Sequence, residues 1–225
     1  MRSTDSDTPK RQVYAGFASV ARALGHEHRL ELLEHLGQGE RAVETLAARA
    51  NLAVANASQH LQQLRRAGLV ASRREGKNVL YRLADGPVID AISALRKVAE
   101  HNLAEIRQVA HAYFEKLDSM EPVSRAELMQ RLGDGTAILL DVRPEDEFRL
   151  GHLPGAMNVS LAKLESRLSE LPAGTEIIAY CRGPYCILSF EAVKLLRDHG
   201  YQVRRLEDGY PEWRAAGLPV EEEVI

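Results

Sequence analysis

The sequence predicts two domains: a mainly α-helical domain with a β-hairpin, followed by an α/β domain with a parallel sheet. Apolar residues recur at helical spacing through the first half, whereas short apolar runs alternate with helical patterns in the second. A length of 225 residues also suits two small domains. We expect a disordered tail at 1–11, domains at 12–117 and 123–225, and a linker at 118–122.

The composition is that of an ordinary soluble protein, with 45% hydrophobic and 27% charged residues. No apolar run is long enough to span a bilayer, and no secretory pattern is visible, so we expect a cytoplasmic protein without a membrane partner. Two cysteines are too few for an extracellular disulfide framework. The net charge of −3 does not indicate nucleic-acid binding, so local charge clusters must decide that question.

The first domain is predicted to contain a helix-turn-helix. Apolar spacing predicts a helix from Gln12 to Leu24, ended by Gly25, and a second helix with Leu30, Leu33 and Leu36 on one face. A third helix at 43–50 and a fourth at 54–67 are joined by a three-residue turn at 51–53. Two short helices joined by so tight a turn are typical of this motif.

The fourth helix has a polar face with two possible interpretations. Ala57, Leu61 and Leu64 form its buried stripe. Neutral amides on the other face can read adenine edges in the major groove, and arginine can bind phosphate or guanine. The alternative is a merely solvated surface. The candidate DNA-binding residues are Asn56, Ser58, Gln59, His60, Gln63, Arg65 and Arg66.

A β-hairpin follows and favours the DNA-binding interpretation. Residues 69–74 and 79–83 read as strands, and 75–78 supply the turn. Arg73, Arg74 and Lys77 lie near its tip, where they would contact phosphates beside the groove. A polar helix followed by a basic hairpin predicts a winged helix.

Four short motifs mark the fourth helix and the hairpin: Ser58-Gln59-His60-Leu61, Arg66-Ala67-Gly68-Leu69-Val70, Arg74-Glu75-Gly76-Lys77 and Tyr81-Arg82-Leu83. Through these motifs, residues 13–117 resemble the winged-helix repressors of the ArsR/SmtB family. The resemblance implies a homodimer, formed by the first and last helices, that binds an inverted-repeat operator in double-stranded DNA. The last helix would run from Pro87 to Leu117, and the recognition helices of the dimer would lie about 34 Å apart.

The sequence departs from that family where many members carry thiolate metal ligands. Residues 40–46 contain no cysteine, so the soft-metal site is absent. A site formed by His101, Glu105 and His111 is the alternative, since His101 and Glu105 would share a helix face. We expect no metal and no cofactor.

The second domain is predicted as an alternation of helices and strands. Ser124-Arg125-Ala126-Glu127 is a capping box that opens a helix. Buried strands are expected at 137–142 and 176–180, with a late strand at 203–206. Sites in such sheets lie beyond the carboxyl ends of strands, and the strand at 176–180 is followed by Cys181.

Both cysteines, Cys181 and Cys186, lie in one loop between this strand and a helical pattern from Ser189 to His199. Loop amides and a helix N-terminus favour a thiolate. We therefore expect a reactive cysteine here.

The second domain contains a set of short motifs: Leu140-Asp141-Val142-Arg143, Glu147-Phe148, Gly151-His152-Leu153-Pro154-Gly155-Ala156, Tyr180-Cys181-Arg182-Gly183 and Leu206-Glu207-Asp208-Gly209 with Trp213. Through these motifs, residues 122–220 resemble single-domain rhodaneses. The resemblance implies that Cys181 takes a sulfane sulfur from a donor such as thiosulfate and passes it to a thiol acceptor. Arg182 would attract an anionic donor, while Asp141, Arg143 and Glu147 would brace the loop that contains Gly183 and Tyr185.

Cys186 is either a small buried residue or a resolving thiol that attacks a persulfide on Cys181. The two resemblances together predict a repressor whose rhodanese domain forms that persulfide and senses or processes reactive sulfur. The alternatives are a sulfurtransferase localised by its DNA-binding domain, and an arsenic-responsive repressor that uses both thiols.

Overall fold

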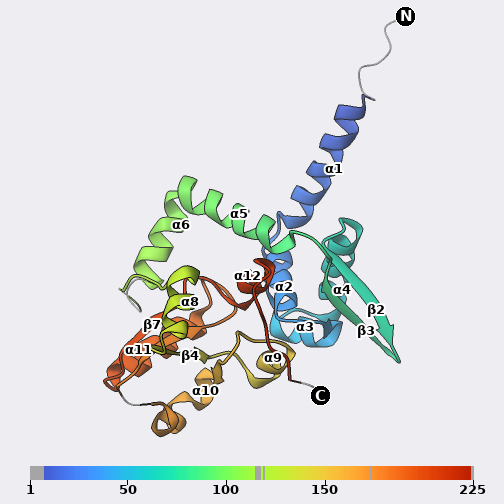
Figure 1. Ribbon diagram of the computed structural model, residues 1–225. Helices are drawn as coiled ribbons and strands as arrows, with labels where there is room; N and C mark the ends of the chain where they lie inside the picture. The colour runs from blue at the N-terminus through green and yellow to red at the C-terminus, as the bar shows by residue number, and fades with distance from the viewer. Residues whose placement is uncertain (1–7, 115–117, 119, 173, 224–225) are drawn as a thin grey trace, which may run out of the picture. The chain divides into compact units, whose positions relative to one another are not determined.

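A computed structural model of the chain describes residues 8–114, 118, 120–172 and 174–223 (Figure 1). The chain divides into two compact units, Met1–Val88 and Ile89–Ile225. This division precedes the expected linker, whose placement at 118–122 stays a prediction. Among the described residues, no helix is long and apolar enough to cross a membrane.

The first unit has four helices among its described residues: α1 (Pro9–Leu24), α2 (Glu27–Gly37), α3 (Val43–Arg49) and α4 (Val54–Arg66). Helix α1 starts before the predicted Gln12, because the Thr8 hydroxyl accepts the Arg11 amide at 3.4 Å and Pro9 occupies the first turn. The expected disordered tail is therefore wrong at residues 9–11. Residues 1–7 lie outside the described part of the chain.

The predicted helix-turn-helix is present as α3 and α4. The turn depends on Asn51, which adopts a left-handed φ of 51° that asparagine tolerates better than most residues. The Leu52 amide donates to the Ala47 carbonyl at 2.8 Å and closes the end of α3. The predicted stripe on α4 is correct, since Ala57, Leu61 and Leu64 are fully buried.

The predicted hairpin is also present, formed by β2 (Val70–Glu75) and β3 (Asn78–Leu83) (Figure 1). The two strands pair antiparallel with Glu75 opposite Asn78, so Gly76 and Lys77 form the tip. Gly76 has φ 59°, as such a tight hairpin turn requires. A short strand that the sequence did not indicate, β1 (Arg41–Ala42), pairs with β3.

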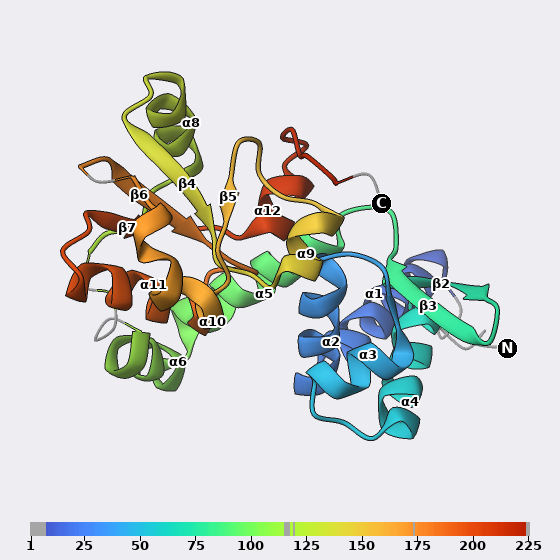
Figure 2. The same cartoon turned by 90° about the horizontal axis from the view of Figure 1, so that it is seen from below.

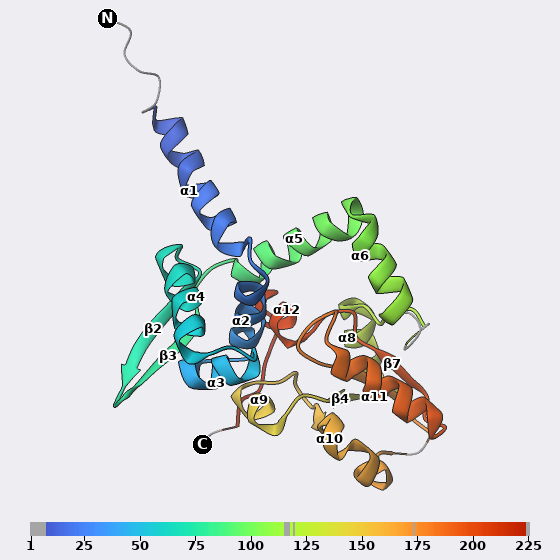
Figure 3. The same cartoon turned by 180° about the vertical axis from the view of Figure 1, so that it is seen from behind.

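The single helix predicted from Pro87 to Leu117 is wrong. The structure has α5 (Val88–Asn102), α6 (Ala104–Val109) and a π-helical turn, η1 (Ala110–Phe114), with a bend at Leu103 (Figure 3). Leu103 is extended, with φ −103° and ψ 112°. The Arg107 guanidinium donates to the His101 carbonyl at 2.6 Å and caps the end of α5. Residues 115–117 lie outside the described part.

The second unit contains the predicted α/β domain. Four parallel strands form its sheet in the order β5-β4-β6-β7 (Figure 2). They are β4 (Ala137–Asp141), β5 (Met157–Asn158), β6 (Glu176–Tyr180) and β7 (Val203–Arg205). The helical elements are α8 (Arg125–Gly133), α9 (Glu145–Leu150), α10 (Leu161–Leu164), η2 (Glu165–Glu170), α11 (Ile187–Asp198) and α12 (Tyr210–Ala215).

Both faces of this sheet are covered. Ala179 on β6 packs in one apolar cluster with Leu196 of α11, whereas Ile178 packs in the other with Leu128 of α8 and Trp213 of α12. Successive residues of a strand point to opposite faces, so β6 contributes to both cores. The polar ends of β4 and β6 are therefore the part of the sheet left for a site.

Candidate functional site

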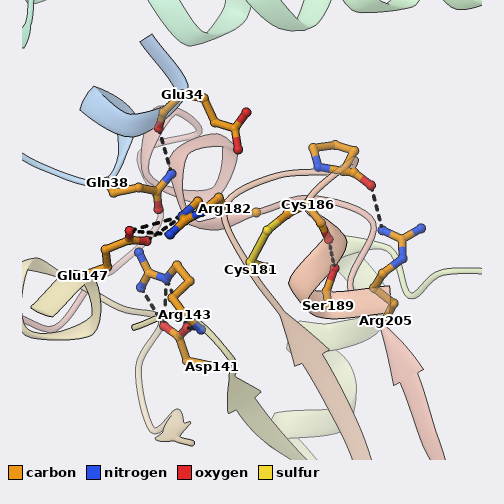
Figure 4. Close-up of a disulfide and its surroundings, with 12 residues drawn as sticks. Glu34, Gln38, Asp141, Arg143, Glu147, Cys181, Arg182, Cys186, Ser189 and Arg205 are labelled. Carbon is orange, nitrogen blue, oxygen red and sulfur yellow. Dashed lines mark hydrogen bonds and ion pairs between the residues drawn. A yellow bond between two sulfur atoms is a disulfide. The ribbon is translucent and has the colours of Figure 1, made fainter. Parts of the chain in front are cut away.

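The two cysteines lie together at the carboxyl end of β6 (Figure 4). Cys181 follows the strand directly, and Cys186 is the residue that precedes α11. Both side chains are buried, and a disulfide joins them, with their Cα atoms 6.2 Å apart. That spacing is ordinary for a disulfide. The pair can therefore exist as two thiols or as one bond.

Backbone hydrogen bonds fix both ends of this cysteine loop, residues 181–186. The Tyr210 amide donates to the Cys181 carbonyl at 3.0 Å, and the Ser189 hydroxyl donates to the Cys186 carbonyl at 2.9 Å. The Cys186 amide donates to the Gly183 carbonyl at 3.1 Å. That amide is thus occupied, and proline at position 184 has no N–H, so neither contributes to a thiolate cradle.

Gly209 explains why the loop lies so close to the start of α12. A Cβ at this position would collide with the backbone of Arg182 and Gly183. Only glycine permits the contact. The sequence showed Gly209 as part of a motif but gave no indication of this packing role.

Below the loop, Arg143 is fully buried and paired with Asp141 (Figure 4). Its Nη2 lies 2.6 Å from Asp141 Oδ2 and donates to the Gly151 carbonyl at 2.8 Å. The guanidinium also stacks on the Tyr210 ring, 4.5 Å from its centroid. Burial alone would lower the pKa of Arg143, but the charge and hydrogen bonds of Asp141 raise it overall. The pair is a buried ion pair at the carboxyl end of β4, and its role in bracing the cysteine loop stays a prediction.

Arg182 is held by Glu147, whose side chain is fully buried (Figure 4). Its Nη2 lies 2.8 Å from Glu147 Oε1, and its Nε donates to the same carboxylate. This pairing offsets the charge of Arg182 and weakens the expected attraction for an anionic donor. Glu147 thus forms an ion pair with a residue of the cysteine loop, and its bracing role stays a prediction.

Tyr185 reaches out of the loop toward α5. Its hydroxyl donates to Glu100 Oε1 at 2.9 Å. Burial and the Glu100 carboxylate raise the pKa of Tyr185 to about 12. Sequence reasoning missed Glu100, because nothing in a helical pattern indicates a partner that lies so far along the chain.

The candidate DNA-binding residues on α4 fall into two groups. Asn56, Gln59 and Arg66 are exposed, and Ser58 is half-buried. Gln63 and Arg65 have partners within the unit: Gln63 Oε1 accepts a hydrogen bond from Arg29 at 2.6 Å, and Arg65 donates to Ser72 of β2 at 3.2 Å.

Arg29 is a residue that sequence reasoning missed. Its side chain is buried and also donates to the Ala23 and Arg22 carbonyls at the end of α1. It therefore ties α1 and α2 to α4. Its only signal in the sequence was a cation among the apolar residues of the second helix.

On the hairpin, Arg74 and Lys77 are exposed near the tip, as predicted. Arg73 is exposed too, but its guanidinium pairs with Glu40 at 2.5 Å and with Glu75 at 2.7 Å. Hydrogen bonds to Glu40 and Glu75 raise the pKa of Arg73. Its charge is thus partly offset before any phosphate approaches.

His60 is half-buried beside two other histidines. Its ring centroid lies 4.5 Å from that of His26 and 5.7 Å from that of His28. Burial, followed by the charges of His26, Arg29 and His28, lowers the pKa of His60. Protonation of His60 is therefore less favourable than that of an ordinary exposed histidine.

The structure does not place His101 and Glu105 on one helix face, as the alternative metal site requires. His101 and Glu105 lie on either side of the bend at Leu103, so they belong to different helices. The side chain of His111 lies outside what the structure describes. In the described part of the chain, no group of three His, Cys, Asp or Glu side chains is arranged to hold a metal ion.

Residues 124–216 match the family model of the rhodanese-like domain, and residues 24–73 match that of a helix-turn-helix domain. The chain is 45% identical over 206 residues to the HTH-type transcriptional regulator Rv0324 of Mycobacterium tuberculosis, a match that covers 91% of this chain and 90% of that protein. It is 34% identical over 95 residues to a sulfurtransferase of Allochromatium vinosum, covering 41% of this chain and 87% of the relative.

Among solved structures, the chain is similar to a homodimeric winged helix-turn-helix DNA-binding domain from Mycobacterium bovis, a possible ArsR-family regulator. The identity is 35%, the match covers 46% of this chain and 95% of that one, and the TM-score is 0.41. The match to the M. tuberculosis regulator extends over both domains. The chain therefore belongs to the ArsR/SmtB-type helix-turn-helix transcriptional regulators that carry a C-terminal rhodanese-like domain.

Proposed function

We propose that this regulator is a homodimeric repressor whose Cys181 forms a persulfide and thereby controls operator binding. The observation that supports this most directly is the placement of both cysteines of the chain in one loop, within bonding distance. A DNA-binding domain without cysteine is thus joined to a domain with a thiol pair. The thiol pair is the soft, sulfur-reactive group available to the protein.

The first step is sulfur transfer to Cys181. The Cys181 thiolate attacks the sulfane sulfur of a donor such as thiosulfate, and a new S–S bond forms. The S–S bond of thiosulfate breaks, and sulfite leaves with the electron pair, so charge and atoms balance. With a polysulfide donor, the shortened polysulfide is the leaving group. The pair of Arg182 with the buried Glu147 holds the loop for this attack, and the buried Arg143–Asp141 pair lies below it.

The second step uses Cys186. Its thiolate attacks the inner sulfur of the persulfide, forms the Cys181–Cys186 bond and expels HS⁻, which leaves as hydrogen sulfide after taking a proton. The disulfide keeps the oxidation that the donor supplied. Cys186 is thus the resolving thiol.

The DNA-binding half of the proposal rests on exposed side chains. Helix α4 presents Asn56 and Gln59, and the hairpin presents Arg74 and Lys77. Apolar side chains that would be costly to leave in water support a dimer: Val13, Tyr14 and Phe17 on α1, and Leu95, Val98, Leu103, Ile106 and Val109 on α5, α6 and the bend. A second copy of the chain would cover them.

The experiment compares operator binding before and after exposure to polysulfide. DNA selected by the reduced protein from a random-sequence pool supplies the operator, and fluorescence anisotropy measures the Kd. We expect polysulfide to weaken binding by the wild type at least tenfold. Cys181→Ser should not respond, and mass spectrometry should show that it lacks the intramolecular disulfide. Equal release of wild type and Cys181→Ser would refute the role of Cys181.

A second function is an enzymatic one, favoured by the similarity of residues in the second domain to proteins named as sulfurtransferases. One of these, the human thiosulfate:glutathione sulfurtransferase, is 33% identical over 104 residues, covering 40% of this chain and 90% of that protein. Steady-state turnover of thiosulfate with a thiol acceptor would support this function. A single turnover per Cys181 would instead support a sensor.

A further inference from the structure

Tyr185 connects the cysteine loop to helix α5 within the second unit. It is the residue directly before Cys186, and its hydroxyl donates to Glu100 Oε1 at 2.9 Å. Its ring also contacts Phe114 of η1, with centroids 5.1 Å apart, and Phe114 packs on Phe190 of α11 at 4.8 Å. One side chain of the loop thus touches α5 and η1, two of the helical elements that precede the α/β domain.

A second connection lies one helical turn earlier on α5. Arg96 lies 3.6 Å from Glu212, whose carboxylate accepts the Gly209 amide at 3.1 Å. Gly209 packs directly against the backbone of the cysteine loop. Arg96 and Glu100 are four residues apart and lie 3.5 Å from each other, so both connections are on one face of α5.

Glu100 is a carboxylate that accepts from a phenol, so the bond is charge-assisted and stronger than a neutral one. The Tyr185 hydroxyl is separated from the Cys186 sulfur only by the Tyr185 side chain, one peptide unit and the short Cys186 side chain. A change in the bonding of that sulfur therefore changes where the hydroxyl can lie. The loop must also accommodate an additional sulfur atom when Cys181 is a persulfide.

We propose that Tyr185 and Glu100 form a latch that closes when Cys181 and Cys186 are bonded and opens when they are not, and so transmits the state of the thiols to α5. The latch rests on the proposed function, because α5 carries apolar residues of the proposed dimer face. With the bond formed, the loop is held short and Tyr185 reaches Glu100. With two thiols or a persulfide, the loop relaxes, and α5 loses that contact. The free energy of one such hydrogen bond is enough to change the ratio of the two states by about tenfold.

The test measures operator affinity of the full-length protein in the reduced state and in the disulfide state produced by polysulfide. Loss of two hydrogen masses confirms the disulfide. The variants are Glu100→Ala, which removes the acceptor, and Tyr185→Phe, which removes the donor. Matched controls are Glu105→Ala, on the exposed surface of α6, and Tyr201→Phe, whose hydroxyl donates to the Leu168 carbonyl elsewhere in the domain.

We expect the wild type and both controls to lose about tenfold in affinity on disulfide formation. Glu100→Ala should still form the disulfide but change its affinity by less than twofold, and Tyr185→Phe should behave in the same way once its disulfide is complete. A wild-type response in both variants would refute the latch. Far-UV circular dichroism and Trp213 fluorescence show whether each variant is folded.

Hydrogen exchange separates failure of the latch from failure of the proposed function. In the wild type, amides of α5 should exchange several-fold more slowly in the disulfide state than in the reduced state, and Glu100→Ala should abolish the difference. If exchange follows this pattern but operator affinity does not change, the latch stands and the sensing function fails. If α5 exchanges equally in both states of the wild type, the latch itself is wrong.

Discussion

Replacing Arg143 with methionine is expected to lower the free energy of unfolding of the rhodanese-like domain by about 3–5 kcal/mol. The reason is the environment of Asp141. Both side chains are fully buried, and Arg143 Nη2 lies 2.6 Å from Asp141 Oδ2. Methionine fills much of the space but leaves a carboxylate without its counter-charge, and an uncompensated buried charge is among the most destabilising defects known.

Urea unfolding followed by Trp213 fluorescence measures this loss in the intact protein. Trp213 is the only tryptophan in the chain and is buried in the core of the second unit, so its signal reports on that unit. With a slope of about 2 kcal/mol per molar urea, the midpoint should fall by roughly 2 M. The matched control is Arg149→Met, because Arg149 is half-exposed in its pair with Glu145 and should cost less than about 0.5 kcal/mol.

A double-mutant cycle measures the coupling between Arg143 and Asp141 directly. Asp141→Asn removes the charge that Arg143→Met leaves unpaired, so the double variant should be more stable than Arg143→Met alone. A loss below about 1 kcal/mol for Arg143→Met, or additive effects in the cycle, would show that the pair is not the brace predicted above.

Three further predictions concern other parts of the molecule. The pKa of His60 should lie below 6.5 by NMR titration and should rise in His26→Gln. As pH falls below 6.5, the unfolded chain binds this proton more readily than the folded chain, so the free energy of unfolding should decrease. An unshifted titration would contradict this. Gly209→Ala should slow sulfur transfer from thiosulfate roughly 100-fold, because the added Cβ displaces the cysteine loop, and stopped-flow release of sulfite measures this. Arg74→Ala should make the slope of log K for operator binding against log salt concentration shallower by about 0.9 per subunit. Arg73→Ala should change this slope less, because Arg73 is already paired with Glu40, and equal slopes for the two variants would contradict the distinction.

The fold was predictable where a pattern is local. The spacing of Ala57, Leu61 and Leu64 predicted α4, and Gly76 within a polar turn predicted the hairpin. Strand β6 was recognisable from its apolar run, and so was the position of Cys181 at its end. In each case the information lies within one turn or one strand of the residue concerned.

Features that depend on distant partners were not predictable. The pattern from Pro87 onward contains no proline or glycine that would indicate the bend at Leu103, and the capping guanidinium of Arg107 acts only once the bend exists. The pair formed by Tyr185 and Glu100 joins positions 85 residues apart. Arg182 was expected to attract a donor, because nothing in the sequence shows that Glu147 lies beside it.

The separation of Cys181 and Cys186, five positions, has a consequence for how a dimer would respond. Closing so short a ring removes only about 2 kcal/mol of unfolded-chain entropy, so the bond can open and re-form with little effect on the global stability of the domain. Each resolving thiol is also present at high effective concentration in its own chain, whatever the protein concentration. Each subunit would therefore react with sulfur independently of its partner. A dimer would contain zero, one or two Cys181–Cys186 disulfides, and its operator affinity would change in steps.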